Sequence, residues 1–175
     1  MPGSIYFKNA LLFIFTMRVL GIDPGSMVTG YGVVDDIKGK LTHVTHGTIE
    51  GKRKDSFPVR LKLIFDGLNK VIEEYKPDSI ALEEVFYGKS VKSSIKIGEA
   101  RGIAILCSAS ANIPMAEYAP TVVKRAVVGV GSAQKGQVGE MVKVILSLSE
   151  VPEKNDASDA LAIAICHCHR SKSVI

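Results

Sequence analysis

Apolar residues occur in three short runs near the start of the chain, and their spacing suits β-strands. The runs lie at Arg18–Asp23, Thr29–Asp36 and Leu41–Ile49, with turn-forming Gly25 and Gly39 between them. Links this short favour an antiparallel meander. We therefore predict three neighbouring antiparallel strands.

The next apolar residues recur at helical spacing over Pro58–Tyr75, and Pro77 ends that pattern. Ser79–Glu83 then reads as a short buried strand. A strand reached through a crossover helix lies parallel to the strand before the crossover. We therefore predict that Ser79–Glu83 runs parallel to Arg18–Asp23.

The second half of the chain alternates helix and strand patterns. The predicted elements are a helix at Val91–Ala111, a strand at Met115–Tyr118, and helices at Thr121–Val128, Gln137–Leu148 and Asn155–Arg170. Three strands, then alternating helices and strands, then helices indicate an α/β fold. Its core is a mixed five-stranded sheet with helices on both faces.

The helix predicted at Val91–Ala111 is apolar over most of its circumference. Gly98 and Gly102 are four residues apart, which leaves a notch where another backbone can approach closely. Such a helix is either central core or the interface of a dimer. The sequence leaves both possibilities open.

The chain has 175 residues with neither an internal repeat nor a low-complexity linker, so we predict one domain over residues 17–170. Residues 1–16 read as an extension before Met17, the expected natural start, or as an extra turn of structure packed on the sheet edge. Residues 171–175 read as a short tail. The apolar run Ala10–Phe15 is too short to span a bilayer and lacks a signal-peptide cleavage site. We expect neither a membrane segment nor a leader.

Composition changes this picture only slightly. A net charge of +4 permits a nucleic-acid partner without requiring one. Three cysteines give no disulfide framework and favour a reducing cytosol. The cluster Cys166-His167-Cys168-His169 lies on a predicted helix without a second cysteine pair, so an ordinary helix end is favoured over a zinc site.

Four acidic residues occupy unusual positions, although each has an ordinary explanation. Asp23 ends an apolar strand but also suits a cap for the turn that follows. Glu83 ends another strand beside Glu84, and taken alone it is better explained as surface charge. Asp156 and Asp159, in the first turn of the last helix, complement the helix dipole. Taken singly, none of the four establishes a site.

Together the four carboxylates indicate a metal site. Adjacent parallel strands would bring Asp23 and Glu83 to one sheet edge, facing Asp156 and Asp159 of one helix. Carboxylates about 4 Å apart repel by roughly 4 kcal/mol, which bound cations relieve. An all-oxygen donor set suits Mg²⁺, or Mn²⁺ in its place, and two ions can cleave a phosphodiester.

Basic and aromatic residues near these carboxylates are candidate DNA contacts. They are Phe86, Lys89, Lys92, Lys124 and Lys135. The lysines suit phosphates, although any single lysine is better explained as part of a solvated charged face. Phe86 suits an unpaired base and equally suits packing into the core. Lys52-Arg53-Lys54 reads as a mobile basic loop.

A series of motifs, which occur in the same order from Met17 to His169, resembles the RuvC family of Holliday-junction resolvases. The matching segments are Gly21-Ile22-Asp23-Pro24-Gly25-Ser26, Thr29-Gly30-Tyr31-Gly32, Ala81-Leu82-Glu83-Glu84-Val85-Phe86, Ala100-Arg101-Gly102, Val127-Val128-Gly129-Val130-Gly131-Ser132 and Asp156-Ala157-Ser158-Asp159-Ala160-Leu161-Ala162-Ile163-Ala164. Residues 1–16 have no counterpart in that pattern, and the tail after Arg170 is short.

The resemblance implies a ribonuclease-H-like fold and a homodimer that nicks two strands of like polarity at a four-way DNA junction, and the cysteine count favours a cytoplasmic location. It implies that Asp23, Glu83, Asp156 and Asp159 bind catalytic Mg²⁺. It also implies junction contacts by Phe86, Lys124 and Lys135, a partnership with the RuvAB branch-migration complex, and products with 5′-phosphate and 3′-hydroxyl ends.

Two other classes of function compete with this interpretation. An actin-like kinase or ATPase lobe shares the fold and an Asp-x-Gly turn, but such enzymes need two lobes and 175 residues supply one. A non-catalytic DNA-binding module of the same fold predicts unchanged function when Asp23 or Asp159 is replaced by asparagine. A nuclease predicts loss of cleavage with binding retained.

Overall fold

The computed structural model describes residues 16–84 and 91–171. The strands are β1 (Thr16–Asp23), β2 (Val28–Ile37), β3 (Lys40–Glu50), β4 (Ser79–Glu83) and β5 (Met115–Tyr118). The helices are α1 (Phe57–Tyr75), α2 (Val91–Ser110), α3 (Pro120–Val128), α4 (Lys135–Ile145) and α5 (Asn155–Ser171). Each predicted element is present, with ends that differ from the prediction by a few residues.

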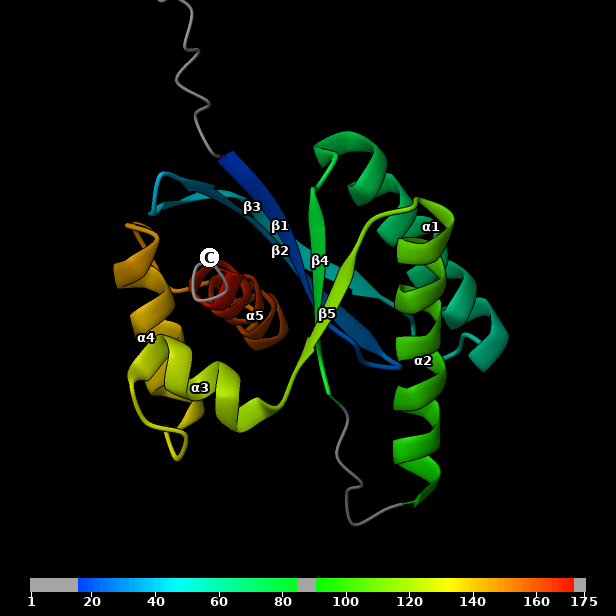
Figure 1. Cartoon of the computed structure of the whole chain (residues 1–175). Helices are drawn as coiled ribbons and strands as arrows, with labels where there is room; N and C mark the ends of the chain where they lie inside the picture. The colour runs from blue at the N-terminus through cyan, green and yellow to red at the C-terminus, as the bar shows by residue number, and fades with distance from the viewer. Residues whose placement is uncertain (1–15, 85–90, 172–175) are drawn as a thin grey trace, which may run out of the picture.

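The five strands form one mixed sheet in the order β3-β2-β1-β4-β5. β1, β2 and β3 pair antiparallel, whereas β4 pairs parallel to both β1 and β5. Helices α1 and α2 lie on one side of the sheet, and α3, α4 and α5 lie on the other (Figure 1). The predicted meander, crossover and two-sided helix cover are therefore confirmed.

Side chains that alternate along the strands belong to two separate hydrophobic cores, one on each face of the sheet. Leu20 and Ile22 of β1 are fully buried against α1 and α2. Val19, on the opposite face of the same strand, is buried with residues of α3, α4 and α5. Because successive strand residues point to opposite faces, β1 is buried on both faces and separates the two cores. Every odd-numbered residue from Val19 to Asp23 faces α5.

Helix α5 packs directly on the backbone of β1 and β2 because glycines lie beneath it. A Cβ atom on Gly21 would lie 2.1 Å from the carbonyl oxygen of Ala160. A Cβ on Gly30 would lie 2.0 Å from the carbonyl oxygen of Asp156, and one on Gly32 would meet Leu161 at 2.7 Å. Any side chain at these positions would push the helix away from the sheet.

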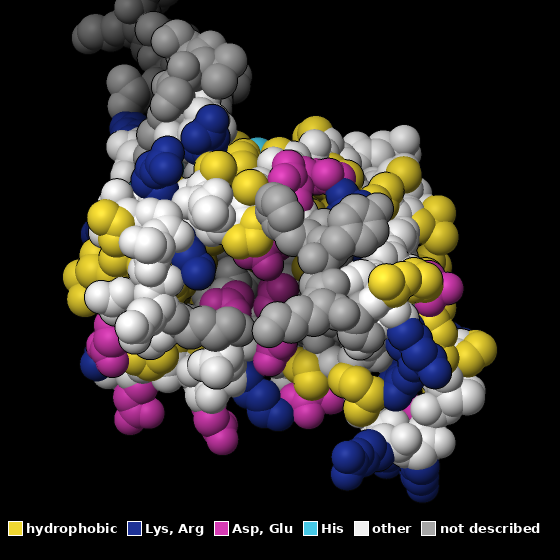
Figure 2. Space-filling view, turned by 90° about the horizontal axis from the view of Figure 1, so that it is seen from below, with side chains coloured by type: hydrophobic (Ala, Val, Ile, Leu, Met, Phe, Trp, Pro, Cys, Tyr) yellow, Lys and Arg dark blue, Asp and Glu magenta, His cyan; other side chains and the backbone are white. Residues whose placement is uncertain are grey.

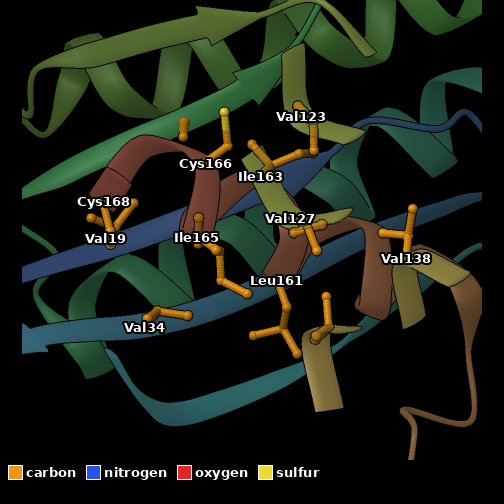
Figure 3. Packing of buried hydrophobic residues seen from close by; sticks show 14 of the residues in the cluster. Val19, Val34, Val123, Val127, Val138, Leu161, Ile163, Ile165, Cys166 and Cys168 are labelled. Atoms are coloured by element: carbon orange, nitrogen blue, oxygen red, sulfur yellow. The ribbon is translucent and has the colours of Figure 1, made fainter. Parts of the chain in front are cut away.

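The other side of α5 is covered by α3 and α4, so the helix is buried around its circumference (Figure 3). Cys166 and Cys168 are fully buried in this apolar cluster. Burial raises the pKa of the Cys166 thiol to about 11. Both cysteines therefore serve as core residues, and the segment that suggested a zinc site is a packed helix.

The ends of the domain only partly fall within the described residues. Thr16 pairs with Ile37, so β1 begins one residue before the predicted domain start. Residues 1–15 and 172–175, and with them the predicted extension and most of the tail, lie outside the described residues. Over 16–84 and 91–171, no helix combines the length and apolarity needed to cross a bilayer.

A half-buried histidine near the end of α5 makes the stability of the fold depend on pH. His167 Nδ1 lies 2.8 Å from the Tyr118 hydroxyl of β5, and burial lowers the pKa of His167 below its ordinary value of 6.5. The unfolded chain therefore binds more protons just below pH 6.5, and the stability gained from neutral His167 is lost as pH falls. We expect the melting temperature to fall between about pH 7.5 and 5.5.

The variant His167→Gln keeps a hydrogen-bonding group and removes the titration, so its melting temperature should depend less on pH than that of the wild type. His43 and His46, whose pKa values burial also lowers, will contribute the remaining dependence. A wild-type melting temperature that is constant over this range would contradict the assignment.

Candidate functional site

Strand register places two carboxylates side by side at the carboxyl edge of the sheet. β1 and β4 run parallel with Ile22 opposite Leu82, so the next residues, Asp23 and Glu83, end neighbouring strands. Ile22 and Leu82 are fully buried on the α1 and α2 side. Alternation therefore turns Asp23 and Glu83 toward α5.

The first turn of α5 reaches the same edge. Gly30 is the antiparallel partner of Asp23 in β2, and the backbone of Asp156 lies directly over Gly30. The helix can approach this closely because Gly30 has no side chain. The sequence thus brings the start of α5, with Asp156 in its first turn and Asp159 just after that turn, next to the end of β1.

A cavity of about 210 Å³ opens at this point. Its lining consists of carboxylates from three elements, one lysine and an apolar wall: Asp23, Glu83, Asp159, Lys124, Pro120, Val123, Val138 and Ala162. Figure 2 shows acidic side chains gathered in a hollow on this face, with lysine and arginine side chains around the rim. Three of the four predicted carboxylates therefore line one cavity at this edge of the sheet.

Lys124 supplies the positive charge at this cavity. It lies on α3, which begins at Pro120 two residues after β5 ends, so the parallel strand order carries it to the same edge. A lysine beside carboxylates in a cavity open to solvent suits an anionic group that approaches the same place. Phosphate is one such group.

The remaining candidates lie elsewhere or outside the described residues. Asp156 is half-buried and is not among the residues that line the cavity. Lys92 is exposed in the first turn of α2, and Lys135 begins α4, although its side chain lies outside the described part. Phe86 and Lys89 fall within 85–90, which the structure does not describe.

The apolar wall of the cavity was not predicted from the sequence as part of a site. Val123 and Val138 are buried members of the α3–α4–α5 core that also border the cavity. Their helical spacing predicts only that they are buried. Nothing in that spacing distinguishes a core valine from one at the edge of a cavity.

The donor set of the cavity suits a hard divalent cation, since all three acidic residues that line it offer oxygen. Within 16–84 and 91–171, however, no three His, Cys, Asp or Glu residues are grouped closely enough to hold an ion together. The carboxylates therefore share one cavity without meeting at one point. Their chemistry fits a metal, whose binding would require side-chain adjustment.

Comparisons with known proteins agree with this geometry. The family model described as crossover junction endodeoxyribonuclease RuvC matches residues 19–167. The RuvC protein of Geobacter sulfurreducens is 50% identical over 161 residues, which cover 91% of this chain and 98% of that protein. The RuvC protein of Pelobacter propionicus is 53% identical over 153 residues, covering 87% of this chain and 86% of that protein.

Solved structures show the same architecture. The T. thermophilus RuvC in complex with a Holliday junction substrate superposes with a TM-score of 0.82 at 29% sequence identity. That match covers 90% of this chain and 97% of the other. Because the alignment spans nearly all of both chains, the similarity includes the sheet, both helical layers and the edge that holds the cavity.

Proposed function

Since this chain belongs to the RuvC family of crossover junction endodeoxyribonucleases, the nucleases that resolve Holliday junctions in recombination and repair, we propose that the cavity at the sheet edge is its catalytic centre. The observation that carries this proposal is the convergence of Asp23, Glu83 and Asp159 from three separate elements on one cavity. Asp156, one turn earlier on α5, is the fourth carboxylate of the proposed site.

Membership of this family makes the enzyme metal-dependent. We propose that Asp23, Glu83, Asp156 and Asp159 hold Mg²⁺, with Mn²⁺ as a substitute, and that two ions bind to each subunit. Bound ions of this kind activate a water molecule and stabilise the leaving oxygen of a phosphodiester. The carboxylates bind and orient the ions, while the apolar wall of Val123 and Val138 restricts bulk water on one side.

Lys124 binds the scissile phosphate in this proposal. Its position in the cavity lining lets its ammonium group face a phosphate that approaches Asp23 and Glu83. Lys92 and Lys135, with Lys89 and Phe86 outside the described residues, are proposed to contact the junction around the cut. Cleavage should leave 5′-phosphate and 3′-hydroxyl ends.

The substrate is proposed to be a four-way DNA junction, cut by a homodimer. T. thermophilus RuvC, similar to this chain over 90% of its length, was solved with a Holliday junction. A two-fold symmetric dimer places its two sites on two strands of like polarity, and paired nicks then separate the junction. We also propose a cytoplasmic location and cooperation with the RuvAB branch-migration complex.

Helix α2 offers the surface for this dimer. Its buried side packs on the sheet with α1, whereas Val91, Ile95 and Leu106 are 72%, 57% and 51% exposed. Gly98 and Gly102 lie among them, and a Cβ at either position would meet nothing within 4 Å. An apolar helix face with an open notch is suited to close packing against a second copy.

The substitution Gly102→Leu should fill this notch and weaken the dimer. We expect the dimer dissociation constant to rise by at least about tenfold, a change of roughly 1.4 kcal/mol, as measured by sedimentation velocity. Gly136→Leu is the matched control, because Gly136 is also helical and open but lies on α4. Equal dimerisation by both variants and the wild type would exclude α2 as the interface.

Mg²⁺ should stabilise the fold by relieving repulsion among the carboxylates. At ten times its dissociation constant a ligand adds about 1.4 kcal/mol, which raises the melting temperature of a domain this size by about 4 °C. Asp23→Asn should reduce that increase, and KCl of equal ionic strength should not reproduce it. An unchanged melting temperature across a Mg²⁺ titration would contradict the proposed cation site.

The proposed activity is tested directly with a labelled four-way junction and a linear duplex of the same sequence. Each is incubated with the protein in Mg²⁺ or in EDTA, and strand ends are mapped on a denaturing gel. Paired nicks at symmetric positions in the junction, only with Mg²⁺, are expected. Failure to cut junctions of several sequences by a folded dimer, in Mg²⁺ and in Mn²⁺, would overturn the proposal.

A further inference from the structure

The basic segment between β3 and α1 is an ordered turn, although its sequence suggests a mobile loop. The Asp55 backbone N–H donates to the Lys52 carbonyl at 3.0 Å, and the Lys52 N–H donates to Asp55 Oδ2 at 2.7 Å. This reciprocal pair closes the turn and leaves Arg53 and Lys54 at its tip. The side chains of Lys52, Arg53 and Lys54 are all exposed.

This turn lies at the same sheet edge as the carboxylates. Asp23 pairs with Gly30, and Gly30 pairs with Thr48, so β3 lies two strands from β1 along that edge. Two strand spacings amount to about 10 Å. The turn follows the end of β3 and is anchored to the segment after Asp23 by the Gly51 N–H, which donates to the Met27 carbonyl at 2.9 Å.

Two further cations lie near this turn and flank one aromatic ring. The guanidinium carbon of Arg60 is 5.6 Å from the centroid of the Phe57 ring, and Lys96 Nζ is also 5.6 Å from that centroid. Arg60 also packs over Gly51 at the start of the turn. Its Nε is buried without a hydrogen-bond partner in the described part of the chain. Two like charges beside one ring favour an anion between or above them.

The described part of the chain supplies no carboxylate partner to these five cations. Elsewhere, basic residues pair with carboxylates, as in Lys154 with Glu50 and Arg101 with Glu117. Across 16–84 and 91–171, no carboxylate lies within 4 Å of a side-chain nitrogen of the set formed by Lys52, Arg53, Lys54, Arg60 and Lys96, here named the basic track.

The adjoining helix ends strengthen the positive potential of the track. Neither α1 nor α2 has an acidic residue in its first turn, and both begin on this side of the molecule, after β3 and after β4. Neither first turn therefore contributes a carboxylate that would offset the positive end of its helix dipole. The side-chain charge and the helix ends act in the same direction.

We propose that the basic track binds the phosphodiester backbone of one junction arm as that arm leaves the catalytic centre. This inference rests on the proposed junction cleavage and assigns it a second DNA contact, separate from the cavity. A lateral offset of about 10 Å, at 3.4 Å per nucleotide along a strand, places the first contacted phosphate about three nucleotides from the cut. Each further 3.4 Å of reach toward the tip of the turn adds about one nucleotide to this distance.

Neutralising the turn tests the proposal through the salt dependence of binding. The triple variant Lys52→Gln/Arg53→Gln/Lys54→Gln should make the slope of log affinity against log salt shallower by about 2 to 3. At 0.15 M salt the junction dissociation constant should rise on the order of tenfold. Both are measured by fluorescence anisotropy in EDTA, with Lys96→Gln as a second variant that leaves the turn intact.

The matched control removes three lysines from the opposite sheet edge: Lys38→Asn/Lys40→Gln/Lys76→Asn. Asparagine tolerates the left-handed backbone at 38 and 76, where φ is 53° and 47°. Equal slopes for the turn variant and this control would overturn the basic track. If the wild type does not cut junctions selectively, the proposed function is overturned instead, so the two failures are distinguishable.

Neutral methylphosphonate linkages locate the contact on the DNA. Linkages about three to six nucleotides from the cut should weaken binding of the wild type but not of the turn variant. If both proteins lose the same affinity at these positions, the arm does not lie on the track.

Discussion

Replacing Asp23 by asparagine should lower the rate of junction cleavage on the order of 10³-fold and leave junction binding nearly unchanged. The substitution keeps the shape of the side chain at the end of β1 and removes the charge that, in the proposed site, binds Mg²⁺ beside Glu83 and Asp159. Several kcal/mol of transition-state stabilisation depend on such an ion. Single-turnover cleavage of a labelled junction measures this effect.

Asp66→Asn is the matched control for this variant. Asp66 is an exposed aspartate on α1 whose only described ion pair is with Lys62, four residues earlier on the same helix. Exposed pairs of this kind contribute little to stability, so cleavage should stay at the wild-type rate. If Asp23→Asn cuts junctions as fast as Asp66→Asn, the cavity is not the catalytic centre.

Substituting Gly21 by alanine should destabilise the fold by about 3 kcal/mol. The added Cβ would lie 2.1 Å from the Ala160 carbonyl oxygen and 2.7 Å from the Ala164 nitrogen, both of which are backbone atoms of α5. A helix backbone cannot rotate away as a side chain can, so α5 must move off the sheet. Urea denaturation monitored by circular dichroism gives the free energy of unfolding.

The same substitution should impair cleavage more than its effect on stability explains. Displacing α5 by about 1 Å moves Asp159 relative to Asp23, and misplacement of that size costs about 10²-fold in rate. Gly136→Ala, in α4 with nothing within 4 Å, should instead stabilise the protein by up to about 1 kcal/mol. Equal stability of the Gly21 and Gly136 variants would mean that the close packing of α5 on β1 does not require glycine at position 21.

Hydrophobic periodicity is sufficient to predict the sheet, its crossover and both helical layers. The same logic brings Asp23 and Glu83 together, because parallel neighbouring strands must end at one edge. The periodicity reports which side chains are buried and in what order. It therefore predicts the two strand carboxylates without any knowledge of how the helices are rotated.

The rotation of helix α5 about its own axis could not be predicted from the sequence. Asp156 and Asp159 are about 60° apart around α5, and only Asp159 lines the cavity. The rotation is determined by backbone contacts of Ala160 with Gly21 and of Asp156 with Gly30. The glycines are visible in the sequence, but the helix that they admit is more than a hundred residues away.

The order of the basic turn could not be predicted from the sequence either. Lys52-Arg53-Lys54 has the composition of a flexible segment, and no local pattern shows that Asp55 closes it. Its relation to Arg60 and Lys96 depends on how α1 packs against α2. Charge can be counted in the sequence, whereas the direction in which that charge faces is a property of the packed helices.

The seating of α5 on Gly21 and Gly30 has a consequence for the time at which the nuclease becomes active. During synthesis the N-terminal elements emerge first, so β1 and β4 are available to pair well before residue 155. A nascent chain of that length contains Asp23 and Glu83 but lacks Asp159. With Asp159 in the catalytic centre as proposed, we expect chains that have not yet docked α5 to leave DNA junctions uncut.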